Sequence, residues 1–363
     1  MRLTWIFLLT APLLAQVPPP APPPVAIRSP EVLADQRVTF RLRAPKAAEV
    51  IVDRETAKRA PMMKGDDGVW TLTTDPLTPD IYGYRFFVDG VGMMDPVNPM
   101  MKTNLLGPTS AVHVPGQQSW DPRDVPHGSL TEHFYESKIA GDRRSFFVYA
   151  PPGYDARAGK KYPVLYLLHG FSDGSDGWST VGRAHVILDN LIADQKALPM
   201  LVVMPLGYGE PAVLRGPRDP GMNRRNVTKH KDTLLQEVIP QVEKAYRVKT
   251  EPAHRAIAGL SMGGGESLYS GLTAPYAFSY VASFSGAAPE TELLAGLDEG
   301  VNKKVKLLWI ACGKDDFLFK RNLAFLDMLK EKNVTYSWNE TEGAHTWPVW
   351  RRNLTSLAPL LFR

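Results

Sequence analysis

Apolar and polar residues alternate with a period of two through the first part of the chain. Between residue 26 and about residue 115, the runs RVTFRLRAP, AAEVIVD, GVWTLTTD and YGYRFFVDG each place every second residue on one face. This is the pattern of half-buried antiparallel strands, and no helical periodicity interrupts it. Turn signals such as Asp66-Asp67-Gly68 and Asp89-Gly90 separate the runs. The pattern predicts a small all-β sandwich over residues 26–116.

The pattern changes from residue 128 onward, where apolar runs alternate with helical patterns. TEHFYESKIA and RRSFFVYAP predict the antiparallel edge of a sheet, whereas KYPVLYLLHG, MLVVMPLG and KKVKLLWIACG are nearly continuous apolar runs. Such continuous runs are typical of parallel strands buried on both faces. Helical patterns occur in GRAHVILDNLIADQ and TLLQEVIPQVEKAYR, and near residues 319–332 and 350–361. Residues 128–363 are therefore predicted to form an α/β fold, a mainly parallel sheet with helices on both faces.

Three further segments are interpreted as targeting or connecting sequence. Residues 1–15 have a charged start at Arg2 and an apolar core too short to span a membrane, which predicts a cleaved secretory signal. Residues 16–25 contain six prolines and predict an extended tether. Residues 117–127, with Pro122 and Pro126, are interpreted as a linker. We therefore expect a secreted or periplasmic protein without a membrane span when mature, an uncleaved N-terminal anchor being the alternative.

Charge and cysteine content narrow the choice of function. The formal net charge of +4 is too small to indicate nucleic-acid binding. Cys312 is the single cysteine, so no intramolecular disulfide is possible, and its place in an apolar run favours a buried small residue. The fold must therefore be held by packing alone.

The stretch HRAIAGLSMGGGESLYSGL carries the most informative motif. An apolar run stops at Ser261, and a helical pattern begins a few residues later. Gly259, Ser261 and Gly263 form G-x-S-x-G in the strand–turn–helix context of a nucleophile elbow. The flanking glycines allow the tight turn that exposes the serine Oγ. Ser261 is therefore the candidate nucleophile, although a small turn residue is the alternative.

Acid and base candidates follow in the order that a hydrolase requires. Asp315 and Asp316 come directly after a predicted strand, and His345 lies in a loop before the last predicted helix. A serine hydroxyl needs an imidazole to take its proton, and the imidazole needs a carboxylate to fix its tautomer. Spacing alone does not choose between the two aspartates. Because carboxyl ends of parallel strands meet at one edge, these groups are expected to lie together, and their chemistry needs no metal or cofactor.

Ester hydrolysis also needs donors for the oxyanion and a surface for the substrate. The backbone N–H groups of Met262, directly after the serine, and Phe171, in the loop after LLHG, are the candidate donors. Trp178 and Trp347 lie near the catalytic loops and are candidates for contact with an aromatic acyl group or a sugar. A place in the core is the alternative for each tryptophan.

The segment from about residue 128 to the C-terminus resembles a known family. LLHGFSDGSDGW, HRAIAGLSMGGG, CGKDDFLF and GAHTWPVWRRNL are similar to the feruloyl-esterase and esterase-D branch of the carbohydrate esterases, which have the α/β-hydrolase fold. The resemblance implies a triad of Ser261, Asp316 and His345. It also implies release of ferulic or related hydroxycinnamic acids from feruloylated arabinoxylan or oligosaccharide.

The same resemblance leaves other activities open. The family also contains acetylxylan esterases, S-formylglutathione hydrolases, siderophore esterases and acyltransferases. The expected export argues against a cytosolic glutathione thioester. Siderophore esterases usually have an aromatic residue where Met262 stands, but they too carry an N-terminal sandwich. A non-catalytic glycan-binding protein is the alternative from another class.

The first region has a resemblance of its own. RLRAP, the GVW around Trp70 and YGYRFFVDG…DPVNP are similar to the immunoglobulin-like N-terminal modules of isoamylase and branching enzymes, and to related carbohydrate-binding modules. Some such modules bind polysaccharide and others only pack against the enzyme. Glycan binding by this region, and the oligomeric state, are left open at this point.

Overall fold

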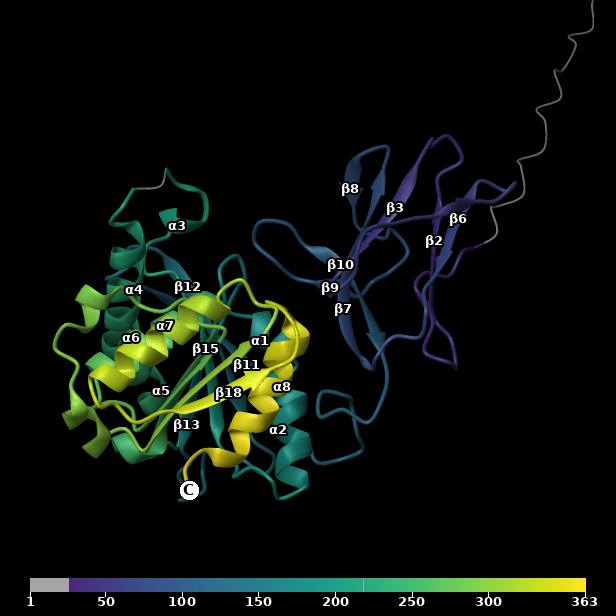
Figure 1. Cartoon of the computed structure of the whole chain (residues 1–363). Helices are drawn as coiled ribbons and strands as arrows, with labels where there is room; N and C mark the ends of the chain where they lie inside the picture. The colour runs from purple at the N-terminus through teal and green to yellow at the C-terminus, as the bar shows by residue number, and fades with distance from the viewer. Residues whose placement is uncertain (1–25, 218) are drawn as a thin grey trace, which may run out of the picture.

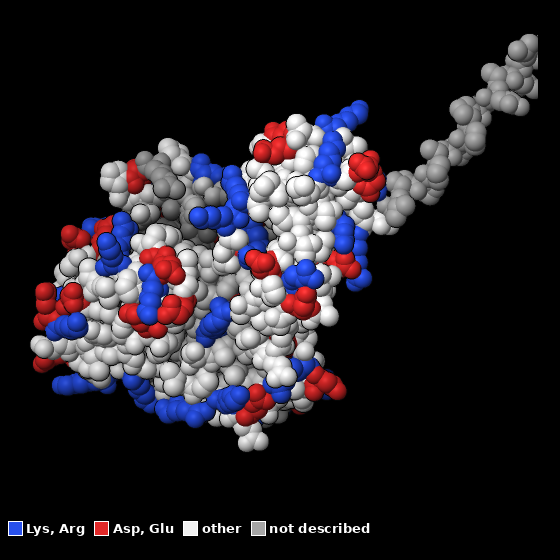
Figure 2. Space-filling model, turned by 45° about the vertical axis from the view of Figure 1, so that its right-hand side comes forward, with Lys and Arg blue, Asp and Glu red and all other residues white. Residues whose placement is uncertain are grey.

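The computed structural model describes residues 26–217 and 219–363, in an antiparallel β region followed by an α/β region (Figure 1). The predicted signal, residues 1–15, and the predicted tether, residues 16–25, lie outside the described residues. Within the described part of the chain, no helix is both long and apolar enough to span a bilayer. Charged side chains of both signs are scattered over the face seen in Figure 2.

Two antiparallel sheets form the N-terminal region. The first has the strand order β1 (Glu31–Val32), β2 (Val38–Arg43), β6 (Val69–Thr73), β5 (Met63–Lys64). The second has the order β4 (Ala60–Pro61), β3 (Val50–Arg54), β7 (Asp80–Val88), β10 (Thr109–Val114), β9 (Met101–Lys102), with β8 (Val91–Met93) paired to β7. Side chains of both sheets share one core, including Phe40 and Trp70 from the first and Tyr84 and Phe86 from the second. Trp70 is thus a core residue, and its Nε1 donates to the Ala44 carbonyl at 2.9 Å.

An eight-stranded sheet forms the centre of the α/β region. Its strand order is β11 (Ser129–Glu136), β12 (Arg143–Ala150), β14 (Leu201–Pro205), β13 (Val164–Leu168), β15 (Arg255–Leu260), β16 (Tyr280–Phe284), β17 (Leu307–Gly313), β18 (Ser337–Thr341). The pairs β11–β12 and β12–β14 are antiparallel and the last six strands are mutually parallel, which confirms the predicted arrangement. Strand β16, five residues long, was not predicted, although Pro275 marks the turn before it.

Helices cover both faces of this sheet (Figure 1). They are α1 (Gly177–Thr180), α2 (Ala184–Ala193), α3 (Ala212–Arg215), α4 (Met222–Thr233), a π-helical turn (Leu234–Val238), α5 (Ile239–Ala245), α6 (Ser261–Thr273), α7 (Phe319–Glu331) and α8 (Trp347–Leu357). Short 3₁₀ turns occur at Pro252–His254, Thr291–Leu294, Glu299–Lys303 and Ala358–Leu360. Helices α2 and α8 pack on one face, and α5, α6 and α7 on the other. Helix α8 begins earlier than predicted, since Pro348 fits the first turn of a helix.

The single cysteine lies near the end of β17. Cys312 has no exposed surface. Burial, with a smaller contribution from Asp316, raises the pKa of its thiol to about 12. This agrees with the expected buried structural residue.

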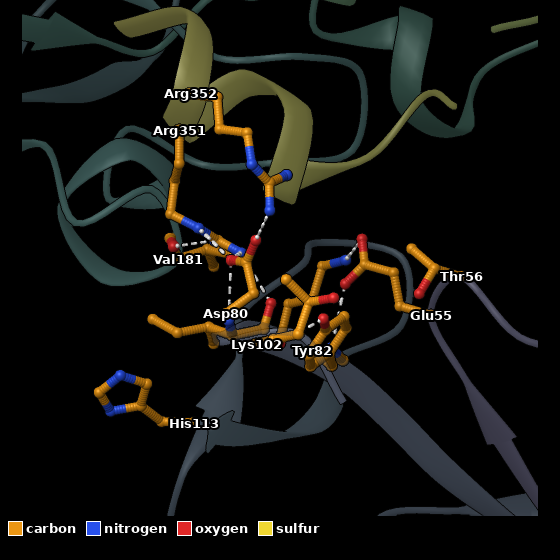
Figure 3. Close-up of polar contacts among 12 residues, drawn as sticks. Glu55, Thr56, Asp80, Tyr82, Lys102, His113, Val181, Arg351 and Arg352 are labelled. Atoms are coloured by element: carbon orange, nitrogen blue, oxygen red, sulfur yellow. Dashed lines mark hydrogen bonds and ion pairs between the residues drawn. The ribbon is translucent and has the colours of Figure 1, made fainter. Parts of the chain in front are cut away.

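A buried ion pair joins the two regions (Figure 3). Asp80, at the start of β7, accepts hydrogen bonds on Oδ1 from Arg351 Nε and Nη2 at 3.1 and 2.6 Å. Arg352 donates to Asp80 Oδ2 at 2.7 Å, and Arg351 Nη1 donates to the Val181 carbonyl at 2.8 Å. Neither Asp80 nor Arg351 has exposed surface. Helix α8 is therefore fixed to the antiparallel region.

Residues 117–127, predicted to be a linker, pack against the α/β region. Trp120 is 1% exposed and belongs to the core formed with α2 and α8. Asn190 on α2 donates to the carbonyls of Ser119 and Asp121 at 2.8 and 2.9 Å. The segment runs through turns and bends, and its tryptophan makes it part of the interface.

Candidate active site

The candidate nucleophile lies at the sharp turn between β15 and α6. Ser261 is the first residue of α6 and has φ 51°, a left-handed conformation that is strained for a residue with a side chain. A Cβ at Gly259 would lie 2.4 Å from the Gly263 carbonyl oxygen, and one at Gly263 would lie 2.4 Å from the His169 carbonyl oxygen. The turn therefore requires glycine at both flanking positions of the motif.

A continuous hydrogen-bonded chain links Ser261, His345 and Asp316. His345 lies in the loop between β18 and α8, with Nε2 2.8 Å from Ser261 Oγ and Nδ1 2.8 Å from Asp316 Oδ2. Asp316 follows β17, is 5% exposed, and also accepts from the Leu318 N–H at 2.8 Å. Burial alone would raise the pKa of Asp316, but the hydrogen bonds from His345 and Leu318 outweigh it and hold the pKa below its usual value. Asp315, the other candidate that spacing left open, is exposed.

Two aromatic rings enclose the imidazole of His345. The ring of Phe317 lies with its centroid 4.5 Å from that of His345 and is 74% exposed. The Trp350 ring approaches edge-on, with centroids 4.9 Å apart and an interplanar angle of 90°. Phe317 was not selected from the sequence, although its place directly after Asp316 could have indicated it.

The candidate oxyanion donors lie on either side of the serine. Met262 is the second residue of α6, where helix N–H groups have no partner within the helix. Phe171 lies in the turn between Gly170 and Asp173, closed by the Asp173 N–H on the Gly170 carbonyl at 3.2 Å. A Cβ at Gly170 would lie 3.3 Å from Ser261 Cβ, so this turn passes close beside the nucleophile. Ser261, Met262 and Phe171 line the same cleft.

This cleft has a volume of about 560 Å³. Its apolar wall includes the side chains of Val213, Met222, Val227, Leu293 and Phe317. Arg224 and Glu290 form an exposed ion pair at its rim, with Nη2 and Oε2 2.9 Å apart. Polar side chains, among them Asp219, Asn223 and Arg321, also line it, and its size and mixed lining suit a small organic group next to the nucleophile.

The two tryptophans considered for substrate contact do not line this cleft. Trp178 has no exposed surface, and its Nε1 donates to the Leu168 carbonyl at 2.9 Å. Trp347 is 2% exposed, and its ring meets that of Trp178 at 5.1 Å and 82°. The expected contact with substrate does not fit these positions, because a side chain without exposed surface has none to offer. Both belong to the core beneath the site.

A cluster of buried polar side chains lies under the cleft floor. His169 accepts the Gly207 N–H on Nε2, and its Nδ1 lies 2.8 Å from the Gly170 carbonyl, so the ring holds two loops of the site. Burial lowers the pKa of His169 to about 4. Glu266 on α6 accepts from Asn226 at 3.0 Å, and burial raises its pKa well above the usual range. Glu266 was not predicted from the sequence, because a charged residue in a helix is ordinarily exposed.

Comparison with known proteins assigns the chain to a family. The model of the Esterase family, described as "Putative esterase", matches residues 137–361, more than half of the chain. The chain belongs to the Esterase family. Its α/β fold with a nucleophile elbow is therefore that of an esterase with relatives among the feruloyl esterases.

Sequence relatives of this Esterase-family chain include a two-activity protein. It is 31% identical over 347 residues to the endo-1,4-beta-xylanase/feruloyl esterase of Xylanibacter ruminicola, covering 92% of this chain and 46% of that protein. The chain thus spans about half the length of this curated relative.

Solved structures share the fold. The ferulic acid esterase of Anaeromyces mucronatus is 23% identical with a TM-score of 0.60, over 68% of this chain and 96% of that one. The enterobactin esterase of Shigella flexneri is 20% identical with a TM-score of 0.66, over 90% of this chain and 93% of that one. The second alignment is long enough to include antiparallel β region and α/β region together.

Proposed function

We propose that this chain is a secreted serine esterase that releases ferulic or related hydroxycinnamic acids from plant cell-wall polysaccharide, with feruloylated arabinoxylan as the substrate class. The observation that carries the proposal is the hydrogen-bonded chain from Ser261 through His345 to Asp316, which opens on a cleft with an apolar wall. The similarity to a xylanase/feruloyl esterase over nearly the whole chain supports this choice of substrate. The signal-like residues 1–15 support secretion.

The reaction proceeds in two acyl transfers. His345 Nε2, 2.8 Å from Ser261 Oγ, takes the hydroxyl proton as Oγ bonds to the ester carbonyl carbon. The tetrahedral intermediate collapses, the ester C–O bond breaks, and the protonated His345 gives its proton to the leaving alcohol. Water then attacks the acyl-enzyme, with His345 again as base, and the free acid leaves as the Ser261 hydroxyl re-forms. Asp316 fixes the tautomer of His345 and stabilises its charged form.

Backbone N–H groups stabilise the negative oxygen in both steps. The Met262 N–H lies at the start of α6, where the partial positive charge of the helix also favours an anion. The Phe171 N–H supplies the second donor from the facing turn. Each such donor contributes about 3 kcal/mol to the transition state.

The cleft favours an aromatic acyl group over a simple acetyl group. Phe317 and Phe171 both line it and are 74% and 37% exposed, so each ring has accessible surface beside the nucleophile. Exposed rings beside the nucleophile can stack on a phenolic acid and bury its apolar surface. Such stacking would also contact the planar acyl chain of a hydroxycinnamate.

A siderophore esterase is the second candidate. The fold similarity to the enterobactin esterase covers 90% of this chain, including the antiparallel region. An aromatic catecholate ester would also fit an apolar cleft with exposed rings. Acetylxylan esterase and acyltransferase activities use the same triad chemistry, and a non-catalytic glycan-binding protein would use none of it.

Three esters distinguish these functions. The chain from Gln16 onward is assayed with methyl ferulate, p-nitrophenyl acetate and a catecholate siderophore, with Ser261→Ala as the control. Strong preference for ferulate, lost in Ser261→Ala, is the expected result. Cleavage of the siderophore alone would assign the second function. Equal turnover by Ser261→Ala, or failure of a fluorophosphonate to label Ser261, would refute the serine mechanism.

A further inference from the structure

The loop between β9 and β10 of the antiparallel region reaches across to the turn that holds Phe171. The Leu105 N–H donates to the Ser172 carbonyl at 2.7 Å. Asn104 Nδ2 donates to Ser172 Oγ at 2.8 Å and lies 3.3 Å from Asp173 Oδ1. Residues more than sixty positions apart in the sequence are thus in direct contact beside the candidate oxyanion donor.

The contacted turn is strained at the residue that the loop holds. Ser172 is the third residue of the turn from Gly170 to Asp173 and has φ 70°. A positive φ at this position is typical of a type II turn, which normally places glycine there. For a serine this conformation costs on the order of 1 kcal/mol, so it needs support from outside the turn. Hydrogen bonds to both the carbonyl and the hydroxyl of Ser172 supply that support.

Asn104 acts as an adaptor between its own loop and the turn. Its Oδ1 accepts from the N–H groups of Leu106 and Gly107 at 3.0 and 3.2 Å. Its Nδ2 donates to the turn. The amide therefore fixes the shape of the loop with one end and the position of Ser172 with the other.

Other contacts hold the same loop in place. Thr103 Oγ1 donates to Asp176 Oδ2 at 2.9 Å, and Asp176 follows the turn by three residues. Arg215, on α3 at the cleft side, donates to the Leu105 carbonyl at 2.8 Å. The loop is thus attached to three elements around the ester site, and its conformation is not set by the antiparallel region alone.

We propose that Asn104 and the Leu105 N–H are positioning groups for the oxyanion turn, so that the antiparallel region contributes to the turnover of small esters. The inference rests on the proposed esterase function. This positioning role differs from glycan binding by the antiparallel region. A glycan-binding region would affect only large substrates, whereas a positioning loop would also affect the turnover of an ester too small to reach the antiparallel region.

The expected effect is on the transition state. The Phe171 N–H must meet an oxygen that carries negative charge only as the tetrahedral intermediate forms, so a displaced donor weakens the transition state more than the bound substrate. Removing an oxyanion donor entirely costs about 10²–10³ in kcat, and loosening one by loss of its support should cost about 10-fold. The KM of the substrate should change by less than about twofold, since ground-state contacts stay in place.

The test compares three variants of the whole chain with p-nitrophenyl acetate. Asn104→Ala removes both ends of the adaptor. Asn104→Asp keeps the acceptor for the loop but loses the donor to Ser172 and brings a carboxylate toward Asp173. Asn98→Ala is the matched control, because Asn98 also donates twice, to Tyr84 Oη and the Ala111 carbonyl, but within the antiparallel region.

We expect kcat to fall about 10-fold in both Asn104 variants, with KM nearly constant, and to stay within about twofold in Asn98→Ala. A boronic acid that mimics the tetrahedral intermediate should bind more weakly to the Asn104 variants in proportion to kcat/KM. Unchanged kcat in Asn104→Asp, or an equal fall in Asn98→Ala, would overturn the positioning role. An inactive wild-type chain would instead refute the proposed function.

Discussion

Replacing Asp80 with alanine should destabilise the whole chain by more than any surface ion pair could. Asp80 and Arg351 have no exposed surface, and Asp80 accepts from both Arg351 and Arg352. The substitution leaves the Arg351 guanidinium buried, with the carbonyls of Val181 and Ile81 as its hydrogen-bond partners and the Trp120 ring 5.7 Å away. Breaking a buried pair by removing one partner costs about 3–5 kcal/mol, because the remaining charge is uncompensated.

Asp53→Ala is the matched control for this substitution. Asp53 lies in the same region and also faces two arginines, Arg85 at 3.1 Å and Arg59 at 3.5 Å, but these are 45% and 56% exposed. Exposed pairs of this kind contribute about 0–1 kcal/mol. The two substitutions therefore remove the same type of side chain, from a fully buried ion pair at Asp80 and from a partly exposed one at Asp53.

Urea unfolding followed by tryptophan fluorescence measures the difference. The free energy of unfolding should fall by about 3–5 kcal/mol in Asp80→Ala and by less than about 1 kcal/mol in Asp53→Ala. The double variant Asp80→Ala/Arg351→Leu should recover part of the loss, since it removes the buried unpaired charge. Losses within about 1 kcal/mol of each other in the two single variants would refute the argument. A double variant less stable than Asp80→Ala would refute it as well.

Two other substitutions test the site and its surroundings. Asp316→Asn should lower kcat by about 10⁴ because the His345 tautomer is no longer fixed, whereas Asp315→Asn should leave it unchanged; equal effects would refute the choice of acid. Because the pKa of buried His169 is lowered to about 4, the unfolded chain binds the extra proton first as pH falls. The contribution of His169 to the free energy of unfolding should therefore fall by about 3 kcal/mol between about pH 6.5 and pH 4, and His169→Gln should lack this contribution. Chemical denaturation across this range measures it, and parallel curves for the two proteins would contradict the prediction.

Local signals account for what the sequence predicted well. The elbow at Ser261 needs only a strand, a tight glycine turn and a helix in succession. Each of the three has a recognisable sequence pattern within a few residues of the serine. Asp316 and His345 follow strand ends, and the parallel sheet brings such ends to one edge. The two antiparallel sheets follow from period-two runs, although the immunoglobulin-like type and the exact domain limits stay predictions.

Long-range packing explains what the sequence did not predict. Asp80 and Arg351 lie 271 positions apart, and no periodicity relates them. Trp178 and Trp347 stand next to catalytic loops in the sequence, yet their rings turn inward, because an apolar ring gains more from a core than from a cleft wall. The contact of Asn104 with Ser172 depends on how two regions dock, which neither region's pattern contains.

The single cysteine of the chain can report transient opening of strand β17. Cys312 is the chain's single cysteine, has no exposed surface, and lies on β17 beside the edge strand β18. With its pKa raised to about 12, it presents almost no thiolate to a reagent while the sheet is closed. A disulfide-exchanging dye can therefore label the chain only when β17 is transiently uncovered. The rate of labelling therefore reports openings at the strand that precedes Asp316, without any introduced probe.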